Sequence, residues 1–301
     1  MTAAPEPAPD PPRASARLPI SAVLITRDAA RRLPEVLAAV ASCAERLVLD
    51  SGSSDATVAI ARAAGARVEH QDFLGYGPQK CRAVELAAHD WILSIDADEV
   101  LDEQARRALG TADLSDPAAC YAFRRRTFIG DREIRHGPWS DDRVLRLFNR
   151  RTATFKPLPV HEEVAASRPP VLLPGSILHY SYAGVGDVLG RSLRYAPLKA
   201  AIMRRKGQRI NPLTMPLRGL TAFVKSYVLR GGWRDGPAGF VVALSRVIDS
   251  TLPRAMILLD EPVAGDGRPP ADHVADRSAS SSPAMSAGSA AASASRSPEA
   301  G

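Results

Sequence analysis

The chain has 301 residues, of which 45% are hydrophobic and 24% charged, and its formal net charge is +6. This length and apolar content allow one large domain or two small ones with a buried core. The chain contains no apolar run of about 18 residues, so no membrane span is predicted. The N-terminus does not resemble a secretory signal. The three widely spaced cysteines favour neither a zinc site nor a disulfide framework, as expected in a reducing compartment.

Composition divides the chain into four parts. Residues 1–17 and 262–301 are rich in Ala, Pro and Ser, and we expect disordered tails there because such segments bury too little apolar surface to fold. Residues 18–185 are predicted to form the main domain, and residues 186–261 a basic helical extension.

Short apolar runs alternate with helical patterns in the first part of the main domain. Strands are predicted at 20–25, 47–49, 67–69 and 91–95, and helices at about 29–42, 56–64, 79–88 and 101–109. This alternation predicts an α/β fold with a doubly wound, mostly parallel sheet and helices on both faces. Ligands bind at the carboxyl ends of such strands, where this chain carries Thr26, Asp50 and Asp96.

The fourth strand leads into three carboxylates, Asp96, Asp98 and Glu99. In an extended chain Asp96 and Asp98 point to the same side, so both can face one divalent cation. Because no EF-hand or zinc spacing is present, the pattern predicts Mg²⁺ or Mn²⁺ held together with substrate phosphates. Alternatively, Asp98 and Glu99 cap the helix at 101–109.

The first strand is followed by neither a dinucleotide-binding glycine motif nor a P-loop. A nucleoside diphosphate site remains, in which a cation on the aspartate pair bridges the diphosphate and an acid at a neighbouring strand end, Asp50, binds base or ribose. Turn chemistry is the alternative for Asp50, and turn and cap chemistry is the preferred interpretation of Asp55.

Three segments, ISAVLIT (20–26), LDSGSSDAT (49–57) and SIDADE (94–99), resemble glycosyltransferase family 2, which has the GT-A fold. Later segments are similar to its lipopolysaccharide core β-1,4-glucosyltransferase subgroup: GYGPQK (75–80), RVLRLF (143–148), VHE (160–162), HYSY (179–182) and DGPAGF (235–240). The resemblance covers about 18–255, and it implies a nucleotide-sugar-binding and catalytic domain at 18–185. In the first loop the family's usual Thr-Lys-Asn-Glu is Thr26-Arg27-Asp28-Ala29 here, and its usual Lys-Asn is Lys80-Cys81.

Glycosyl transfer needs a stabilised diphosphate leaving group. We expect Lys80, or Arg82 two residues on, to contact the phosphates, unless these side chains form a solvated helix face. The resemblance also makes His179 a candidate metal ligand, whereas a buried histidine bonded to backbone is the commoner case.

A general base must take a proton from the acceptor hydroxyl. Glu162 is preferred because it falls where the subgroup has its His-Glu, and an ordinary surface acid is the alternative. Asp142 is the second choice, although it could instead pair with Arg143 or Arg146. The other acids considered are Glu163 and Asp141.

From Arg191 to Arg234 the chain has eleven Lys and Arg and no Asp or Glu. Because these bases alternate with apolar side chains, we predict contact with an anionic membrane surface, with solvated basic helices as the alternative. No nucleic-acid-binding motif is present, so no nucleic acid partner is expected. The expected location is cytoplasmic, peripheral on the inner membrane.

The sequence and the resemblance together imply an inverting, metal-dependent glycosyltransferase. It would move a hexose, with glucose the first choice, from a nucleotide-diphosphate sugar to a lipid-linked or lipopolysaccharide-core glycan acceptor. One alternative is transfer to a polyprenyl phosphate, which needs no strong base. The other is a non-catalytic membrane-binding module that senses a nucleotide sugar.

Overall fold

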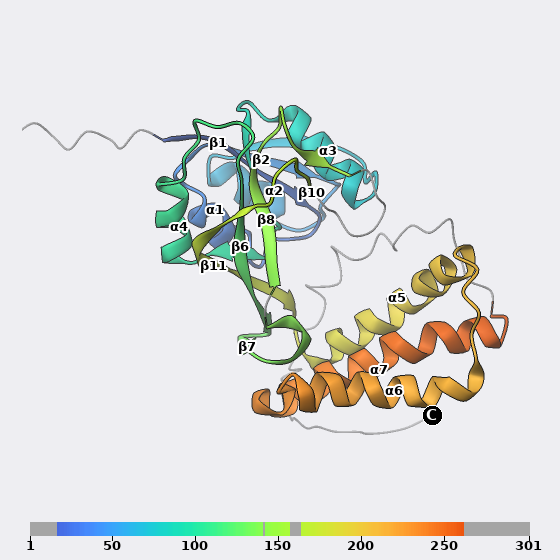
Figure 1. The fold of residues 1–301 in the computed structure, drawn as a ribbon. Helices are drawn as coiled ribbons and strands as arrows, with labels where there is room; N and C mark the ends of the chain where they lie inside the picture. The colour runs from blue at the N-terminus through green and yellow to red at the C-terminus, as the bar shows by residue number, and fades with distance from the viewer. Residues whose placement is uncertain (1–16, 141, 157–163, 262–301) are drawn as a thin grey trace, which may run out of the picture.

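The computed structural model describes residues 17–140, 142–156 and 164–261 (Figure 1). Its strands are β1 (Leu18–Thr26), β2 (Cys43–Asp50), β3 (Arg67–His70), β4 (Trp91–Ser94), β5 (Glu99–Leu101), β6 (Cys120–Ile129), β7 (Arg132–Ile134), β8 (Asp142–Asn149), β9 (Thr154–Phe155), β10 (Val164–Ala165) and β11 (Val171–Tyr182). Its α-helices are α1 (Leu33–Ala39), α2 (Thr57–Ala63), α3 (Tyr76–Leu86), α4 (Glu103–Gly110), α5 (Val185–Arg205), α6 (Met215–Val224) and α7 (Pro237–Leu258). Short helical turns lie at Gly137–Trp139, Pro212–Thr214, Lys225–Leu229 and Gly232–Asp235.

One large sheet has the strand order β3-β2-β1-β4-β8-β6-β11-β5, with β7 paired to β6. Strands β3, β2, β1 and β4 are parallel, as predicted, and so are β6 and β11. β8 runs antiparallel to both β4 and β6, and β5 runs antiparallel to β11. The α/β class and the mostly parallel sheet are confirmed, and the antiparallel strands are the part that the alternation did not predict.

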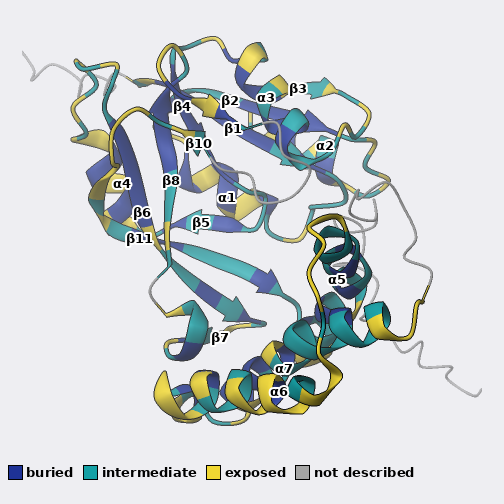
Figure 2. Ribbon diagram, turned by 45° about the vertical axis from the view of Figure 1, so that its right-hand side comes forward, coloured by how far each residue is buried: buried dark blue, intermediate teal, exposed yellow. Residues whose placement is uncertain are grey.

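Side chains of β1 alternate between two hydrophobic clusters, as the twofold period of a strand requires. Ile20, Ala22 and Leu24 lie in the cluster that includes residues of α1, α2 and α4. Val23 lies in the other, which includes residues of α3. Helices therefore cover both faces of the sheet, and its central strands are buried (Figure 2).

The helix expected at 101–109 begins two residues later, at Glu103, and Asp102 caps it. Asp102 Oδ1 accepts a hydrogen bond from the Ala105 amide at 2.8 Å, a typical N-cap contact. Glu99 instead belongs to β5, so the alternative in which Asp98 and Glu99 cap this helix is wrong. Neither carboxylate caps this helix, and of the two only Asp98 lines the cavity described below.

The last three helices pack on one another beside the sheet, with α6 on the side of α7 away from α5 (Figure 1). A Cβ on Gly219 of α6 would lie 3.0 Å from Thr251 Cγ2 of α7, so the missing side chain allows the close approach of these two helices. Within the described residues no helix is long and apolar enough to span a membrane. The two expected tails, apart from Arg17, lie outside the described residues.

Candidate active site

Three parallel strands bring their carboxyl ends to one edge of the sheet. Thr26 at the end of β1 is in register with Asp50 at the end of β2, and β4 on the other side of β1 leads towards Asp96. Thr26 Oγ1 donates a hydrogen bond to Asp50 Oδ1 at 2.9 Å. The polar residues expected at this edge therefore do meet there.

Asp50 is only 3% exposed, and its own loop surrounds its carboxylate. Oδ2 accepts hydrogen bonds from the amides of Gly52 (3.0 Å) and Ser53 (2.8 Å), and Oδ1 accepts from Ser53 Oγ as well as from Thr26. These four bonds match the four acceptor positions of a carboxylate. The geometry thus gives Asp50 the turn chemistry that was its alternative, and its contact with base or ribose stays a prediction.

Asp28 joins the loops that follow β1 and β2. It adopts a left-handed conformation (φ 49°), which Asp tolerates better than most residues. Asp28 Oδ1 accepts from the amides of Ser54 (2.7 Å) and Asp55 (3.2 Å), and the Asp55 carboxylate accepts from the amides of Ala30 and Thr57. The turn and cap interpretation of Asp55 agrees with this geometry.

Asp96 lies between two cations. Its Oδ1 is 2.8 Å from Lys80 Nζ of α3, and its Oδ2 is 2.9 Å from Arg146 Nη2 of β8. Burial by itself would raise the pKa of Asp96, but the charges of Lys80 and Arg146 outweigh it and hold the pKa well below its usual range. Asp96 is therefore ionised, and Lys80 is buried at the site and does not lie on a solvated helix face.

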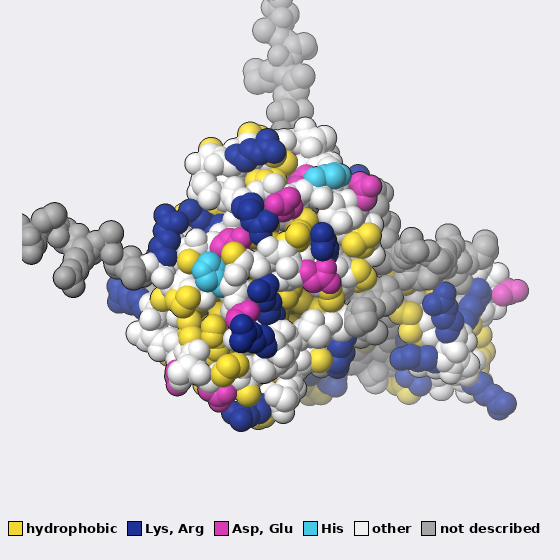
Figure 3. Space-filling view, turned by 90° about the horizontal axis from the view of Figure 1, so that it is seen from above, with side chains coloured by type: hydrophobic (Ala, Val, Ile, Leu, Met, Phe, Trp, Pro, Cys, Tyr) yellow, Lys and Arg dark blue, Asp and Glu magenta, His cyan; other side chains and the backbone are white. Residues whose placement is uncertain are grey.

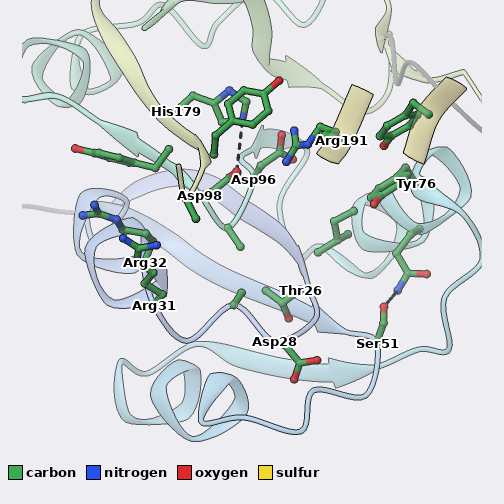
Figure 4. A pocket seen from close by; sticks show the side chains of 18 of the residues that line it. Thr26, Asp28, Arg31, Arg32, Ser51, Tyr76, Asp96, Asp98, His179 and Arg191 are labelled. Atoms are coloured by element: carbon green, nitrogen blue, oxygen red, sulfur yellow. Dashed lines mark hydrogen bonds and ion pairs between the residues drawn. The ribbon is translucent and has the colours of Figure 1, made fainter. Parts of the chain in front are cut away.

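Asp98 faces His179 of β11. Asp98 Oδ2 is 3.4 Å from His179 Nε2 (Figure 4). The Asp98 side chain is 16% exposed and that of His179 is 15% exposed. The strands set this pair, because His179 is in register with Glu99 of β5. Ser181 Oγ lies 2.7 Å from His179 Nδ1 and 2.8 Å from Nε2, so it contacts both ring nitrogens, including the one that faces Asp98.

Glu99 is fully buried beneath the site. Arg146 Nη2 is 2.6 Å from Glu99 Oε1, and Arg125 of β6 is 3.6 Å away, while Glu99 Oε2 accepts from the Asp96 amide at 3.2 Å. Arg125 also donates to Asp142 Oδ2 at 2.8 Å. Within this network Glu99 is buried, and its bond from the Asp96 amide holds the backbone that leads to Asp98.

A cavity of about 500 Å³ opens between the strand ends and the C-terminal helices. Its sheet side includes Thr26, Asp96, Asp98 and His179 (Figure 4). Lys80 also lines it. Aromatic side chains form much of its remaining wall: Phe73, Tyr76, Tyr180, Tyr182 and Tyr195.

The helix α5, which follows the last strand of the sheet, contributes Arg191 to this cavity. Its Nη2 donates to the Ser181 carbonyl at 2.9 Å, and its guanidinium lies 4.5 Å from the centre of the Tyr182 ring. The buried Nε has no hydrogen-bond partner in the described part of the chain. Figure 4 shows Arg191 pointing towards Asp96, so the helix adds a positive charge to the site.

Several predicted residues lie elsewhere. Asp142 does not line the cavity. It forms an ion pair with Arg125, and not with Arg143 or Arg146 as the alternative had it. Arg82 pairs with Glu85 at 3.0 Å on the outer surface of α3 and cannot serve as the alternative to Lys80. Glu162, the preferred base, lies outside the described residues, as do Glu163 and Asp141.

Nothing in the sequence distinguishes Arg191 from the other cations of the basic stretch that it begins. Its only sequence signal was that change of composition, which cannot say which of eleven cations faces the site. The HYSY motif likewise gives no sign of a role for Tyr180, whose ring lies 4.0 Å from the Arg32 guanidinium at the cavity wall.

The donor atoms suit a divalent cation that is held partly by substrate. Two cis ligands each about 2.1 Å from an octahedral ion lie about 3 Å apart, close to the separation of Asp98 Oδ2 and His179 Nε2. Among the described residues no group of three His, Cys, Asp or Glu could hold an ion by itself. Diphosphate oxygens and water would therefore complete the coordination, as is usual for Mg²⁺. That Asp96 is also a ligand stays a prediction, since Lys80 and Arg146 bind both of its oxygens.

Comparison with known proteins places residues 21–168 within the model of the family described as "Glycosyl transferase family 2". The chain is 28% identical over 249 residues to the lipopolysaccharide core biosynthesis glycosyltransferase LpsC of Rhizobium meliloti, covering 80% of this chain and 92% of that protein. It is also 28% identical over 237 residues to an uncharacterized glycosyltransferase of Rickettsia felis, covering 74% and 83%.

Solved structures give partial matches. Glucosyl-3-phosphoglycerate synthase from Mycobacterium tuberculosis, in complex with Mn²⁺, UDP and glucosyl-3-phosphoglycerate, is 23% identical with a TM-score of 0.30, over 38% of this chain and 46% of that one. Mannosyl-3-phosphoglycerate synthase from Rubrobacter xylanophilus is 26% identical with a TM-score of 0.30, over 36% and 40%. The matched segments are less than half of either protein.

The matched residues 21–168 include Thr26, Asp50, Asp96 and Asp98 at the edge of the sheet. The sequence resemblance implies that the sugar donor binds at this edge. Residues 21–168 therefore form a glycosyltransferase family 2 domain, and the chain is a glycosyltransferase.

Proposed function

We propose that the chain transfers a hexose, with inversion and in a Mg²⁺- or Mn²⁺-dependent reaction, from a nucleoside diphosphate sugar to a lipid-linked or lipopolysaccharide-core glycan. The observation that carries this proposal is the cavity that is lined by Asp98 and His179 together with the cations of Lys80 and Arg191. The lipopolysaccharide acceptor class is supported by the similarity to LpsC. Inversion and glucose rest on the sequence resemblance.

The cations of this cavity suit the stabilisation of the leaving diphosphate. Negative charge grows on it as the glycosidic bond to the donor breaks, and fixed cations in a partly dry site lower the energy of that state. Lys80 is held in place by Asp96, and Arg191 by Ser181 and the Tyr182 ring, so neither must reorganise during the reaction. A bound cation at Asp98 and His179 would supply further Lewis-acid stabilisation.

The acceptor hydroxyl must lose a proton as it attacks, and Glu162 remains the base that the sequence predicts. Replacing Glu162 by Gln should lower turnover by two or more orders of magnitude if the acceptor is a sugar hydroxyl. With a polyprenyl phosphate acceptor the same variant should stay nearly as active as the wild type. The non-catalytic sensor is dropped, because the chain is a glycosyltransferase.

The test is to incubate the purified full-length chain with a panel of sugar nucleotides and to follow release of nucleoside diphosphate. We expect slow hydrolysis of one donor that requires Mn²⁺ or Mg²⁺ and stops in EDTA, and faster release when lipopolysaccharide core or lipid-linked glycans are added. Donor turnover that is indifferent to EDTA would refute the metal requirement. Stimulation by polyprenyl phosphate alone would refute the glycan acceptor.

A further inference from the structure

The outer side of α6 and the turns next to it is unusually apolar for a surface. Leu217 and Leu220 of α6 are each 60% exposed, and their spacing of three residues places them on one side of this helix. Leu213, in the turn that precedes α6, is 87% exposed. The exposed apolar surface continues along the chain with Val228 (53%), Leu229 (76%) and Trp233 (55%). These six residues are called the α6 face below.

Cations without carboxylate partners accompany these side chains. Arg218, Lys225, Arg230 and Arg234 are all exposed, and none forms an ion pair with another described residue. Burial lowers the pKa of Arg254, and the nearby positive charge of Arg218 lowers it further.

The acids of the helical part are already used elsewhere. Residues 185–261 contain thirteen Lys and Arg and only five Asp and Glu. Three of these acids are in ion pairs: Asp187 with Arg194, Asp249 with Lys199 and Asp260 with Arg204. Asp235 accepts a hydrogen bond from the His136 amide, and its other oxygen lies 2.9 Å from His136 Nδ1. The space-filling view accordingly shows Lys and Arg side chains with few Asp or Glu on the helical part at its right (Figure 3).

The combination of apolar and basic side chains selects among possible occupants. A second copy of the same face would bring unpaired cations of equal sign together, which is unfavourable. Nucleic acid would satisfy the cations but leave the leucines in water. A bilayer with anionic headgroups takes up Leu and Trp side chains at the level of the acyl chains and neutralises Arg and Lys above them.

We propose that the α6 face docks on an anionic lipid bilayer, with α6 lying in the interface. Figures 1 and 2 support this placement, because α6 is on the side of the helical part away from the sheet and its residues 216–218, 220 and 221 are exposed. The cavity, which α5 and α7 help to line, is then held near the membrane surface without being covered by it. The proposal extends the predicted membrane partner to one defined surface.

Vesicle co-sedimentation of the full-length chain tests the proposal. Phosphatidylcholine vesicles are compared with vesicles that also contain phosphatidylglycerol, and only the second should bind strongly. The double variant Leu217→Ser and Leu220→Ser should weaken that binding at least tenfold. Its matched control is Val171→Ser with Leu172→Ser, which are 55% and 39% exposed at the start of β11 and should bind as the wild type does.

Charge reversal separates the two contributions. Lys225→Glu with Arg230→Glu should lower binding to anionic vesicles by about fivefold or more for each cation, with little change on neutral ones. Arg17→Glu with Arg62→Glu makes the same change in net charge on the sheet domain and should have a much smaller effect. The emission of Trp233 should shift to the blue on anionic vesicles, and Trp233→Phe should remove that shift.

The proposal would be overturned if the wild-type protein did not bind anionic vesicles, or if the control variants lost as much binding as the α6-face variants. It would also be overturned if the wild type were a dimer that binds no lipid and that the leucine variant converts to monomers. Donor hydrolysis by the leucine variant is expected to equal that of the wild type. Failure of lipid binding and failure of the proposed reaction are thus read from separate measurements.

Discussion

Asp98 Oδ2 and His179 Nε2 lie 3.4 Å apart, although the two residues are separated by more than eighty positions in the sequence. The pairing of β5 with β11 creates this contact, since it aligns Glu99 with His179. It gives the cavity one carboxylate and one imidazole at a separation that suits a shared divalent ion.

Asp98→Asn should reduce metal-dependent donor hydrolysis by about 100-fold, and His179→Gln by about tenfold to 100-fold, because each removes a cation ligand. Both variants should need more Mn²⁺ for half-maximal activity, which a titration of rate against metal concentration measures. Asp116→Asn, a surface change in an ion pair with Arg168, is the matched control. An unchanged metal requirement in His179→Gln would make this residue a buried structural histidine.

Arg191→Ala should raise the KM for the sugar nucleotide by about tenfold or more, because a hydrogen bond to a charged group contributes about 1.5–3 kcal/mol. Arg191→Lys should recover part of the loss, since the charge returns without the planar geometry. Arg194→Ala, on the same helix but outside the cavity lining, is the control. A normal KM for the donor in Arg191→Ala would assign this cation to something other than the diphosphate.

Arg146→Met should lower the free energy of unfolding by about 3–5 kcal/mol, because Glu99 is fully buried and would lose its nearest cation. Urea denaturation measures the change. Adding Glu99→Gln removes the stranded charge, so the double variant should be more stable than Arg146→Met alone. If the double variant instead loses the sum of the two single losses in free energy of unfolding, the charges of Arg146 and Glu99 are not coupled.

The stability that Glu133 contributes should depend on pH. Hydrogen bonds from Arg126 and Arg135 outweigh burial and lower the pKa of Glu133 from 4.5 to about 2. A lowered carboxyl pKa stabilises the fold above the unfolded value, so the contribution is complete above about pH 5 and is lost as the pH falls towards 2.

Glu133→Gln should therefore reduce Tm at pH 7 and have little effect near pH 2. Thermal unfolding of both proteins across this pH range measures it. Glu103→Gln, which alters a fully exposed carboxylate, should change Tm much less at any pH. A Tm difference between Glu133→Gln and the wild type that does not vary with pH would contradict the assignment.

The first half of the sheet was predictable because its signals are local. Each of these signals depends only on residues that are close in sequence. They are the short apolar runs, Gly65 with its φ of 73°, and the acidic residues that follow β4. The antiparallel strands were not predictable in this way, since no hairpin joins β8 to β4, and the pairing of Asp142 with Arg125 depends on the register between β6 and β8.

The sequence by itself determined the α/β class, the strand ends that carry the polar residues, and the basic, acid-free stretch from Arg191 to Arg234. These follow from periodicity and composition, which are properties of neighbouring residues. Only the tertiary structure decided that Lys80 and Arg146 bind Asp96, that Arg191 enters the cavity, and that the leucines of α6 stay exposed. Those are contacts between distant segments, and they exist only once strand register and helix packing have fixed which side chains face one another.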